Sequence, residues 1–182
     1  AEGVSLVAGT SAGGVYVASE RDNTASDVSR PSVLRFDVSV SGTELVATDE
    51  WNLATLLPAL PANGGLEGVT WVPDSVLVAR GFVDSSTGKA YDPATYGAHG
   101  DGLFFVGVEG TARIYAVALR DAGVASIVAT IDPKLSVVAD VTWDAASGTL
   151  YAVCDDACGG EIHAMRIAAD GVYAGTFQNV AA

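Results

Sequence analysis

The sequence predicts an all-β protein built from three copies of a four-stranded antiparallel unit. First, a strand-like apolar segment occurs three times, each copy followed by a glycine four residues later: 33–38, 114–119 and 162–167. Second, the openings of the three copies align, at residues 2–6, 67–71 and 139–143. Third, an aromatic-centred strand recurs at residues 15–18 and 150–153. Repeats of roughly 40–50 residues with four short strands each are typical of β-propeller blades.

The first copy covers residues 1–50. Its four strands are expected at residues 2–7, 15–19, 32–38 and 43–48, with the first turn at Gly13 and Gly14. The polar segment 20–30, which ends at Pro31, is expected to be a long loop. Because connections carry function more often than packed strands do, this loop is a candidate functional segment.

Residues 51–65 connect the first copy to the second. Their apolar part, which begins at Trp51, is expected to form a short helical turn on one face of the molecule. Pro58 and Pro61 prevent it from becoming a regular helix, because proline lacks the amide donor that a helix interior needs.

The second copy, residues 66–131, is irregular. Its first strand, at 69–72, is expected to form a hairpin with residues 76–80 through a turn at 73–75. A second run, 103–108, also has strand character, and the sequence does not decide which run is the second strand of the unit. The intervening insertion, residues 82–102, is expected to lack regular structure and to be either a binding lid or a decoration.

The third copy covers residues 138–180 and carries both cysteines. Cys154 and Cys158 are separated by three residues in a turn and can form a disulfide if their Cα atoms lie within about 7 Å. A disulfide indicates an oxidising compartment, so the protein is expected to be extracellular or in the cell envelope. Zinc at these thiols is not expected, because the nearest histidine, His163, lies inside a strand.

The charge balance excludes one class of partner. The chain has 22 acidic residues against nine basic ones, a net charge of −13, which argues against binding the phosphates of nucleic acids. It fits a cation, a basic partner, or a solvated acidic surface. No run of about 18 apolar residues is present, so no membrane-spanning segment is expected.

Several carboxylates are expected to gather at one end of the units. In an antiparallel four-stranded unit, the start of the first strand and the turn between strands two and three lie at the same end. Carboxylates held close together have a raised pKa or recruit a cation, and oxygen ligands suit Ca²⁺. The expected calcium ligands are Glu67, Asp140, Asp155 and Asp156, with Glu2, Glu20, Asp22, His99 and Asp101 as further binding residues. The alternative is that these acids are turn formers in contact with solvent, because no EF-hand spacing is present.

Three motifs carry a resemblance to a known family: residues 65–71, residues 91–105 with their Tyr-Asp-Pro and His-Gly-Asp-Gly segments, and residues 150–156. Over about residues 65–170 the chain resembles the bacterial secreted phytase-like β-propellers grouped as esterase-like activity of phytase. The resemblance implies an exported six-bladed propeller, of which this chain would form about half, and hydrolysis of phosphoesters or esters. The chain lacks a basic cluster for phosphate, which a bound calcium ion can replace.

Two functions of different class follow. One is a calcium-dependent hydrolase with a metal-bound water as nucleophile. The other is a non-catalytic extracellular binding or scaffold module. In either case, three units in a row leave two apolar faces uncovered, expected to be led by Val33, Phe36, Ile162 and Met165. These faces are expected to be covered by the remaining blades of a larger propeller or by a second copy of the chain.

Overall fold

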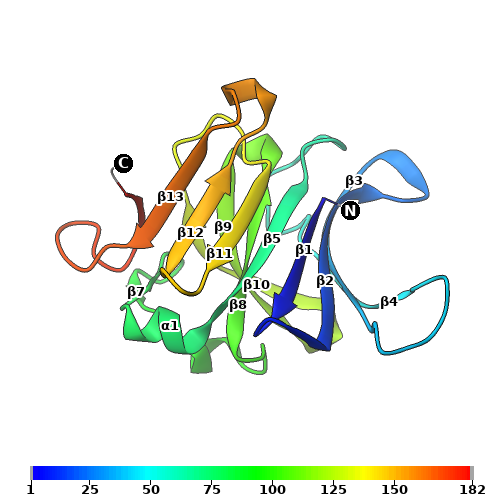
Figure 1. Ribbon diagram of the computed structural model, residues 1–182, viewed down its shortest axis with the longest axis horizontal. Coiled ribbons are helices and arrows are strands. Elements are labelled where there is room, and N and C mark those ends of the chain that lie inside the picture. The colour runs from blue at the N-terminus through cyan, green and yellow to red at the C-terminus, as the bar shows by residue number, and fades with distance from the viewer. Residues whose placement is uncertain (1, 181–182) are drawn as a thin grey trace.

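The computed structural model describes residues 2–180 and confirms the all-β prediction. It contains three four-stranded antiparallel sheets, in each of which the strands lie in sequence order, and one two-stranded sheet (Figure 1). The first sheet consists of β1 (Gly3–Val7), β2 (Thr10–Asp22), β3 (Ala25–Phe36) and β4 (Ala47–Asn52). None of the helices within residues 2–180 has the length and apolar character needed to cross a bilayer.

The first sheet differs from the prediction in its turns. The β1–β2 turn lies at Ala8 and Gly9, both of which have positive φ, and not at Gly13 and Gly14. Strands β2 and β3 continue through the predicted polar loop and close in a hairpin. The Asp22 carboxylate accepts hydrogen bonds from the backbone and hydroxyl of Thr24, so a tight turn replaces the loop.

The last strand of the first sheet also begins later than predicted, at residue 47. Trp51 therefore lies in β4 and not in a helical connection, and its indole Nε1 donates to the carbonyl of Arg120 in the second sheet. A single turn follows, in which the amides of Leu56 and Leu57 donate to the carbonyl of Leu53.

The second sheet consists of β5 (Leu66–Pro73), β8 (Gly102–Val108), β9 (Arg113–Arg120) and β10 (Val124–Ile131). The run at 103–108 is thus the second strand, and the predicted hairpin to 76–80 is wrong. Residues Asp74–Ala79 form helix α1 instead, which follows Pro73 and has Asp74 in its first turn, where a negative charge is favourable.

The insertion packs into the molecule. It contains β6 (Val83–Asp84), β7 (Lys89–Ala90) and the 3₁₀ turn η1 (Pro93–Tyr96), so it is more regular than predicted. Phe82, Tyr91 and Tyr96 are buried in the core, and the Phe82 ring lies 6.1 Å from that of Phe105 in β8. The insertion therefore extends the core and does not stand over the surface as an open lid.

The third sheet consists of β11 (Asp140–Asp144), β12 (Thr149–Val153), β13 (Ile162–Ile167) and β14 (Phe177–Asn179). Three more 3₁₀ turns are η2 (Glu109–Thr111), η3 (Asp121–Gly123) and η4 (Asp156–Cys158). The predicted disulfide between Cys154 and Cys158 is confirmed, with its Cα atoms 6.0 Å apart.

The first strands of the three sheets, β1, β5 and β11, lie side by side (Figure 1). They approach closely where the repeat carries glycine: a Cβ atom on Gly3 would lie 2.7 Å from the Cα of Gly68, and one on Gly68 would lie 2.9 Å from the Cα of Asp140. A side chain at either glycine would keep the sheets apart, so the two glycines permit this arrangement.

Two apolar cores separate the sheets. Tyr16, Val33 and Trp51 pack against Phe104 and Val117 between the first and second sheets. The core between the second and third sheets includes Phe105, Ile114, Leu150, Met165 and Phe177. Val33 and Met165 are therefore interior, and their predicted place on the uncovered faces is wrong. Of that predicted set, Phe36 is half-buried and Ile162 is exposed.

Candidate cation site

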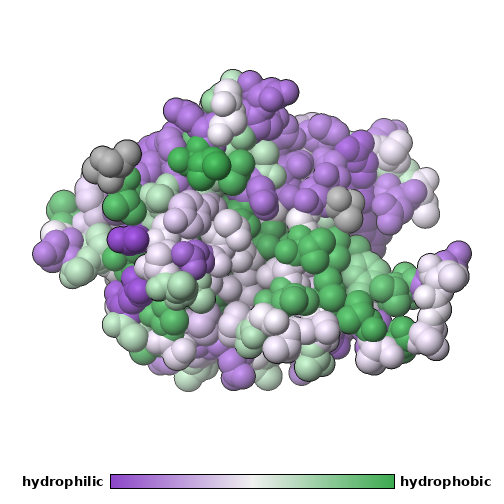
Figure 2. All heavy atoms as spheres, in the orientation of Figure 1, coloured by the Kyte–Doolittle hydropathy of each residue, from purple (hydrophilic) through white to green (hydrophobic). Residues whose placement is uncertain are grey.

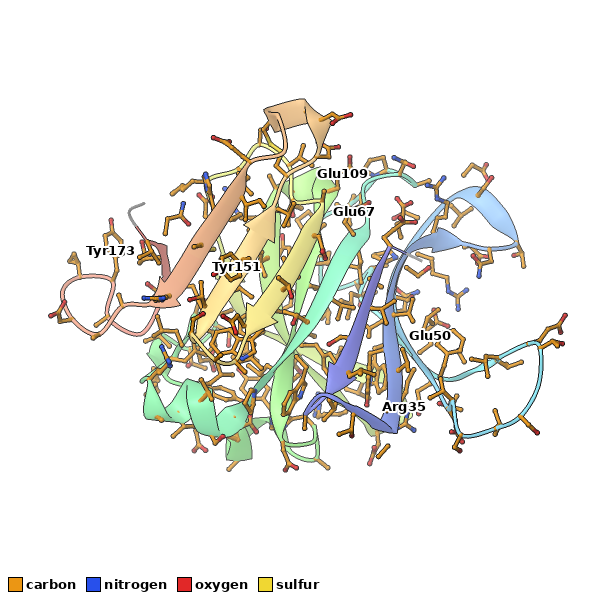
Figure 3. The ribbon with its side chains drawn as sticks, viewed as in Figure 1. Arg35, Glu50, Glu67, Glu109, Tyr151 and Tyr173 are labelled. Carbon is orange, nitrogen blue, oxygen red and sulfur yellow. A yellow bond between two sulfur atoms is a disulfide. The ribbon has the colours of Figure 1, made fainter. Side chains whose placement is uncertain are left out.

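Three glutamates from two sheets converge at one end of the molecule. Glu20 lies near the end of β2, Glu67 in β5, and Glu109 at the start of η2. One carboxylate oxygen from each lies within 4.8 Å of the other two. Figure 3 shows Glu67 and Glu109 near each other where β5 begins.

Irregular strand pairing directs two of these side chains. Leu66 pairs with Val108 and Gly68 with Gly107, so Glu67 is the extra residue of a β-bulge. The β2–β3 pairing also shifts beside Glu20. Bulges re-aim side chains and occur often next to functional sites. The regular alternation of side-chain direction along a strand is therefore not sufficient to predict that these glutamates meet.

Two glycines in the connection between the sheets hold the site together. A Cβ atom on Gly65 would overlap Glu20. The amide of Glu109 donates to the carbonyl of Gly65 at 3.1 Å, and the amide of Gly110 donates to the carbonyl of Gly64 at 3.0 Å. The connecting backbone is thus fixed between Glu20 and the β8–β9 turn that carries Glu109.

The carboxylate of Glu20 is only half satisfied. Its residue is 5% exposed, and its Oε1 accepts from Nη2 of Arg21 at 2.6 Å. Its Oε2 is buried and has no hydrogen-bond partner among the described residues, and the same holds for Oε2 of Glu109. A buried carboxylate oxygen without a partner is costly, because it has lost its water without compensation.

Burial and mutual repulsion perturb the other two carboxyls. Burial, together with the charges of Glu20 and Glu109, raises the pKa of Glu67 to about 7. Burial, followed by the charges of Glu20 and Asp155, raises the pKa of Glu109. A proton or a bound cation relieves such repulsion. Because all the converging donor atoms are carboxylate oxygens, the group could hold a hard cation such as Ca²⁺.

The other predicted metal ligands lie outside this group. Asp140, at the start of β11, lies over Gly68, and its Oδ1 accepts from the amide of Val141 at 2.7 Å. Asp155 and Asp156 are exposed in the turn closed by the disulfide, where Asp155 caps η4 by accepting from the amide of Ala157. The charge of Asp155 contributes to the raised pKa of Glu109.

Of the further predicted binding residues, some lie close enough to influence the three glutamates and others do not. The charge of Glu2, just before β1, contributes to the raised pKa of Glu67. Asp22 instead holds the β2–β3 turn and pairs with Arg30 at 3.1 Å. Asp101 is exposed next to β8.

His99 lies in the insertion, away from the three glutamates. Its side chain is buried, with Nε2 lying 3.0 Å from Oη of Tyr91 and 3.2 Å from Oδ2 of Asp74. Its Nδ1 lies 2.9 Å from the carbonyl of Gly97. Both ring nitrogens therefore have partners in the insertion or in α1.

Sequence reasoning missed Glu109, although the signal was present. The rule that places the turn between strands two and three at the acidic end applies to the β8–β9 turn, where Glu109 lies. The rule could not be applied because the second strand of the unit was undecided between 76–80 and 103–108.

Comparisons with protein-family models, with curated proteins and with solved structures find no match for this chain.

Proposed function

We propose that the protein is a calcium-binding module, with the cation held by Glu20, Glu67 and Glu109. The observation that carries the proposal is the buried Oε2 of Glu20, which has no hydrogen-bond partner among the described residues and belongs to a group of three carboxylates. A divalent cation would satisfy this oxygen and offset the repulsion that raises the pKa of Glu67.

The three four-stranded sheets are proposed to be consecutive blades of a secreted β-propeller. The repeated strand order, the close approach of β1, β5 and β11 at glycines, and an apolar core on each side of the second sheet support this interpretation. The Cys154–Cys158 disulfide supports export to an oxidising compartment. In a propeller, the glutamates would lie near the ends of the innermost strands.

Hydrolysis of a phosphoester is the second candidate function. It is favoured by Arg21, whose guanidinium pairs with Glu20 and whose charge acts on Glu67, so a positive group stands beside the proposed cation. A cation and an arginine together suit a phosphate group, and a bound cation can activate water. The alternative remains a non-catalytic binding module that uses the cation to hold a partner.

Calorimetric titration of chelator-treated protein with CaCl₂ tests the cation site. We expect one binding event per chain, weakened by about 100-fold in Glu20→Gln and in Glu67→Gln, because each loses a charged ligand. Glu44→Gln, the same change at an exposed loop residue, should bind as the unaltered protein does. Absence of calcium binding, or equal binding by all variants, would overturn the proposal.

Turnover of a generic phosphoester separates the two functional candidates. A hydrolase should lose turnover with chelator and with Glu67→Gln, while Arg21→Gln should raise KM more than it lowers kcat. If calcium binds and no turnover occurs, the cation site stands and the catalytic candidate is rejected in favour of a binding module.

A further inference from the structure

The three large sheets form a series in which the second sheet packs on the first with one face and on the third with the other. Along β9, Tyr115 and Val117 pack against the first sheet, whereas Ile114 and Ala116 pack against the third. Equivalent side chains of the three copies point to the same side of their sheet. Met165 in β13 corresponds to Val117, and it too faces the preceding sheet.

Within residues 2–180, no sheet packs on the other face of the first sheet. In β3, Leu34 and Phe36 occupy the positions of Tyr115 and Val117, yet they belong to neither core and remain half-buried. Cross-strand pairing extends them into two apolar rows across β1, β2 and β3: Val4, Val17 and Leu34 in one, Leu6, Val15 and Phe36 in the other. Val4 is 65% exposed and Leu6 is 37% exposed. Figure 2 shows this hydrophobic area over β1 and β2.

The third sheet also has one face on which no other sheet of the described residues packs, and Tyr151 lies on that open face. Ser5 pairs with Tyr16, Thr70 with Phe105, and Thr142 with Tyr151, so the three aromatic residues occupy equivalent positions. Two of them meet an aromatic ring of the next sheet: the Tyr16 ring lies 4.4 Å from that of Phe104, and the Phe105 ring lies 5.5 Å from that of Phe177.

The open face of the third sheet is also hollowed. A hollow of about 450 Å³ is lined by Tyr151, Ile162, Ala164 and Arg166, together with neighbouring residues of β12 and β13 and residues 179–180 at the end of β14 (Figure 3 labels Tyr151). Such a hollow can receive the projecting side chains of an apolar sheet. The first sheet therefore presents a projecting apolar face, and the third sheet presents a recessed face. The two faces are equivalent to those that meet in the contacts between the sheets within the chain.

We propose that two copies of this chain associate head to tail, the open face of β11–β14 in each copy packing on the open face of β1–β4 in the other. The contact between the first two sheets supplies the template. Because Leu6 pairs with Val15 as Trp71 pairs with Phe104, Val15 takes the position of Phe104. Tyr151 of one copy would thus pack on Val15 of the other, as Tyr16 packs on Phe104.

A second copy presents both of the complementary faces that this contact needs. It forms the same contact twice about a two-fold axis, which closes the assembly and leaves no end for further growth. The inference depends on the series of sheets and goes beyond the cation site, so either can fail without the other.

Sedimentation equilibrium of the purified chain tests the association. We expect a dimer of twice the 18.4 kDa chain mass. Val4→Asp and Tyr151→Asp should each weaken it by at least about 100-fold, since each buries a charge in both contacts. The matched controls are Val46→Asp and Tyr173→Asp, at residues that are 84% and 62% exposed outside the strands, and they should leave the dimer unchanged.

Mixing the variants distinguishes the head-to-tail arrangement. A pair formed from one Val4→Asp chain and one Tyr151→Asp chain retains one unaltered contact, so the mixture should dimerise better than either variant alone. A Tyr151→Asp chain that remains fully dimeric would overturn the arrangement in favour of two β1–β4 faces packed together. A monomer at all concentrations would overturn the proposal and leave the face to a sheet of another polypeptide. Near-UV circular dichroism checks folding, and Val4→Ser and Tyr151→Ser replace any variant that fails it.

Discussion

Glu67 and Asp140 open neighbouring sheets of the same repeat, yet their carboxylates lie in different environments. Glu67 is a bulge residue of β5 and meets Glu20 and Glu109. Asp140, at the start of β11, takes the repeat position of Gly68 and lies over that glycine, with Oδ1 bound to the amide of Val141. Glu67 and Asp140 thus differ by one position in the repeat, and only Glu67 belongs to the group of three glutamates.

The difference teaches that the end of a strand does not by itself define a site. Successive side chains of a strand point to opposite sides, so two acids one position apart face different neighbours. The bulge at Glu67 adds a further change of direction. Four predictions test this comparison.

The largest effect is expected from Gly68→Ala. The added Cβ atom would overlap Asp140 and the amide of Val141, so β5 and β11 would have to separate. We expect a loss of about 3 kcal/mol in the free energy of unfolding, measured by urea denaturation. Gly13→Ala, where a Cβ atom meets nothing within 4 Å, is the control and should change stability little. Equal stability of the two variants would show that the first strands are not in close contact.

The second-largest effect is expected on calcium affinity, which should differ between variants of Glu67 and of Asp140. Glu67→Gln is expected to weaken calcium binding by about 100-fold, and Asp140→Asn by less than about threefold, because only Glu67 lies among the converging oxygens. Glu109→Gln should resemble Glu67→Gln. A loss of affinity in Asp140→Asn as large as that in Glu67→Gln would place Asp140 among the ligands.

The third prediction concerns pH. Because the pKa of Glu67 is raised to about 7, the folded protein without calcium binds a proton that the unfolded chain releases near pH 4.5. Stability should therefore fall as pH rises from about 5 to 8, by about 1–2 kcal/mol after allowance for solvent screening. Thermal unfolding with chelator measures this fall, which calcium should remove and Glu67→Gln should flatten. A flat profile in the unaltered protein would contradict the raised pKa.

The smallest effect is expected from Asp140→Asn on stability without calcium. Burial raises the pKa of Asp140, so its charge is slightly unfavourable, while the hydrogen bond from Val141 can be retained by the amide oxygen. The two effects oppose each other, and we expect a change within about 0.5 kcal/mol by urea denaturation. A loss well above that range would mean that the carboxylate has a partner that an amide cannot replace.

The sequence by itself determined the all-β class, the three repeated units and the disulfide. These features depend on local patterns: the alternation of apolar residues, glycine-containing turns and the spacing of Cys154 and Cys158. It also indicated that acids would gather at one end of the units, and it named Glu20 and Glu67. Antiparallel order within a unit is sufficient for that inference.

Only the tertiary structure decided which acids meet and which faces are buried. Residues 76–80 have strand character but form the last part of α1 and the residue after it, and the choice of β8 as the second strand brought Glu109 to Glu20 and Glu67. The direction of Val33 and Met165 into the cores, the bulge at Glu67 and the packing of the insertion likewise depend on contacts between sheets. Such contacts join residues far apart in the chain, and local periodicity carries no information about which of them pack together.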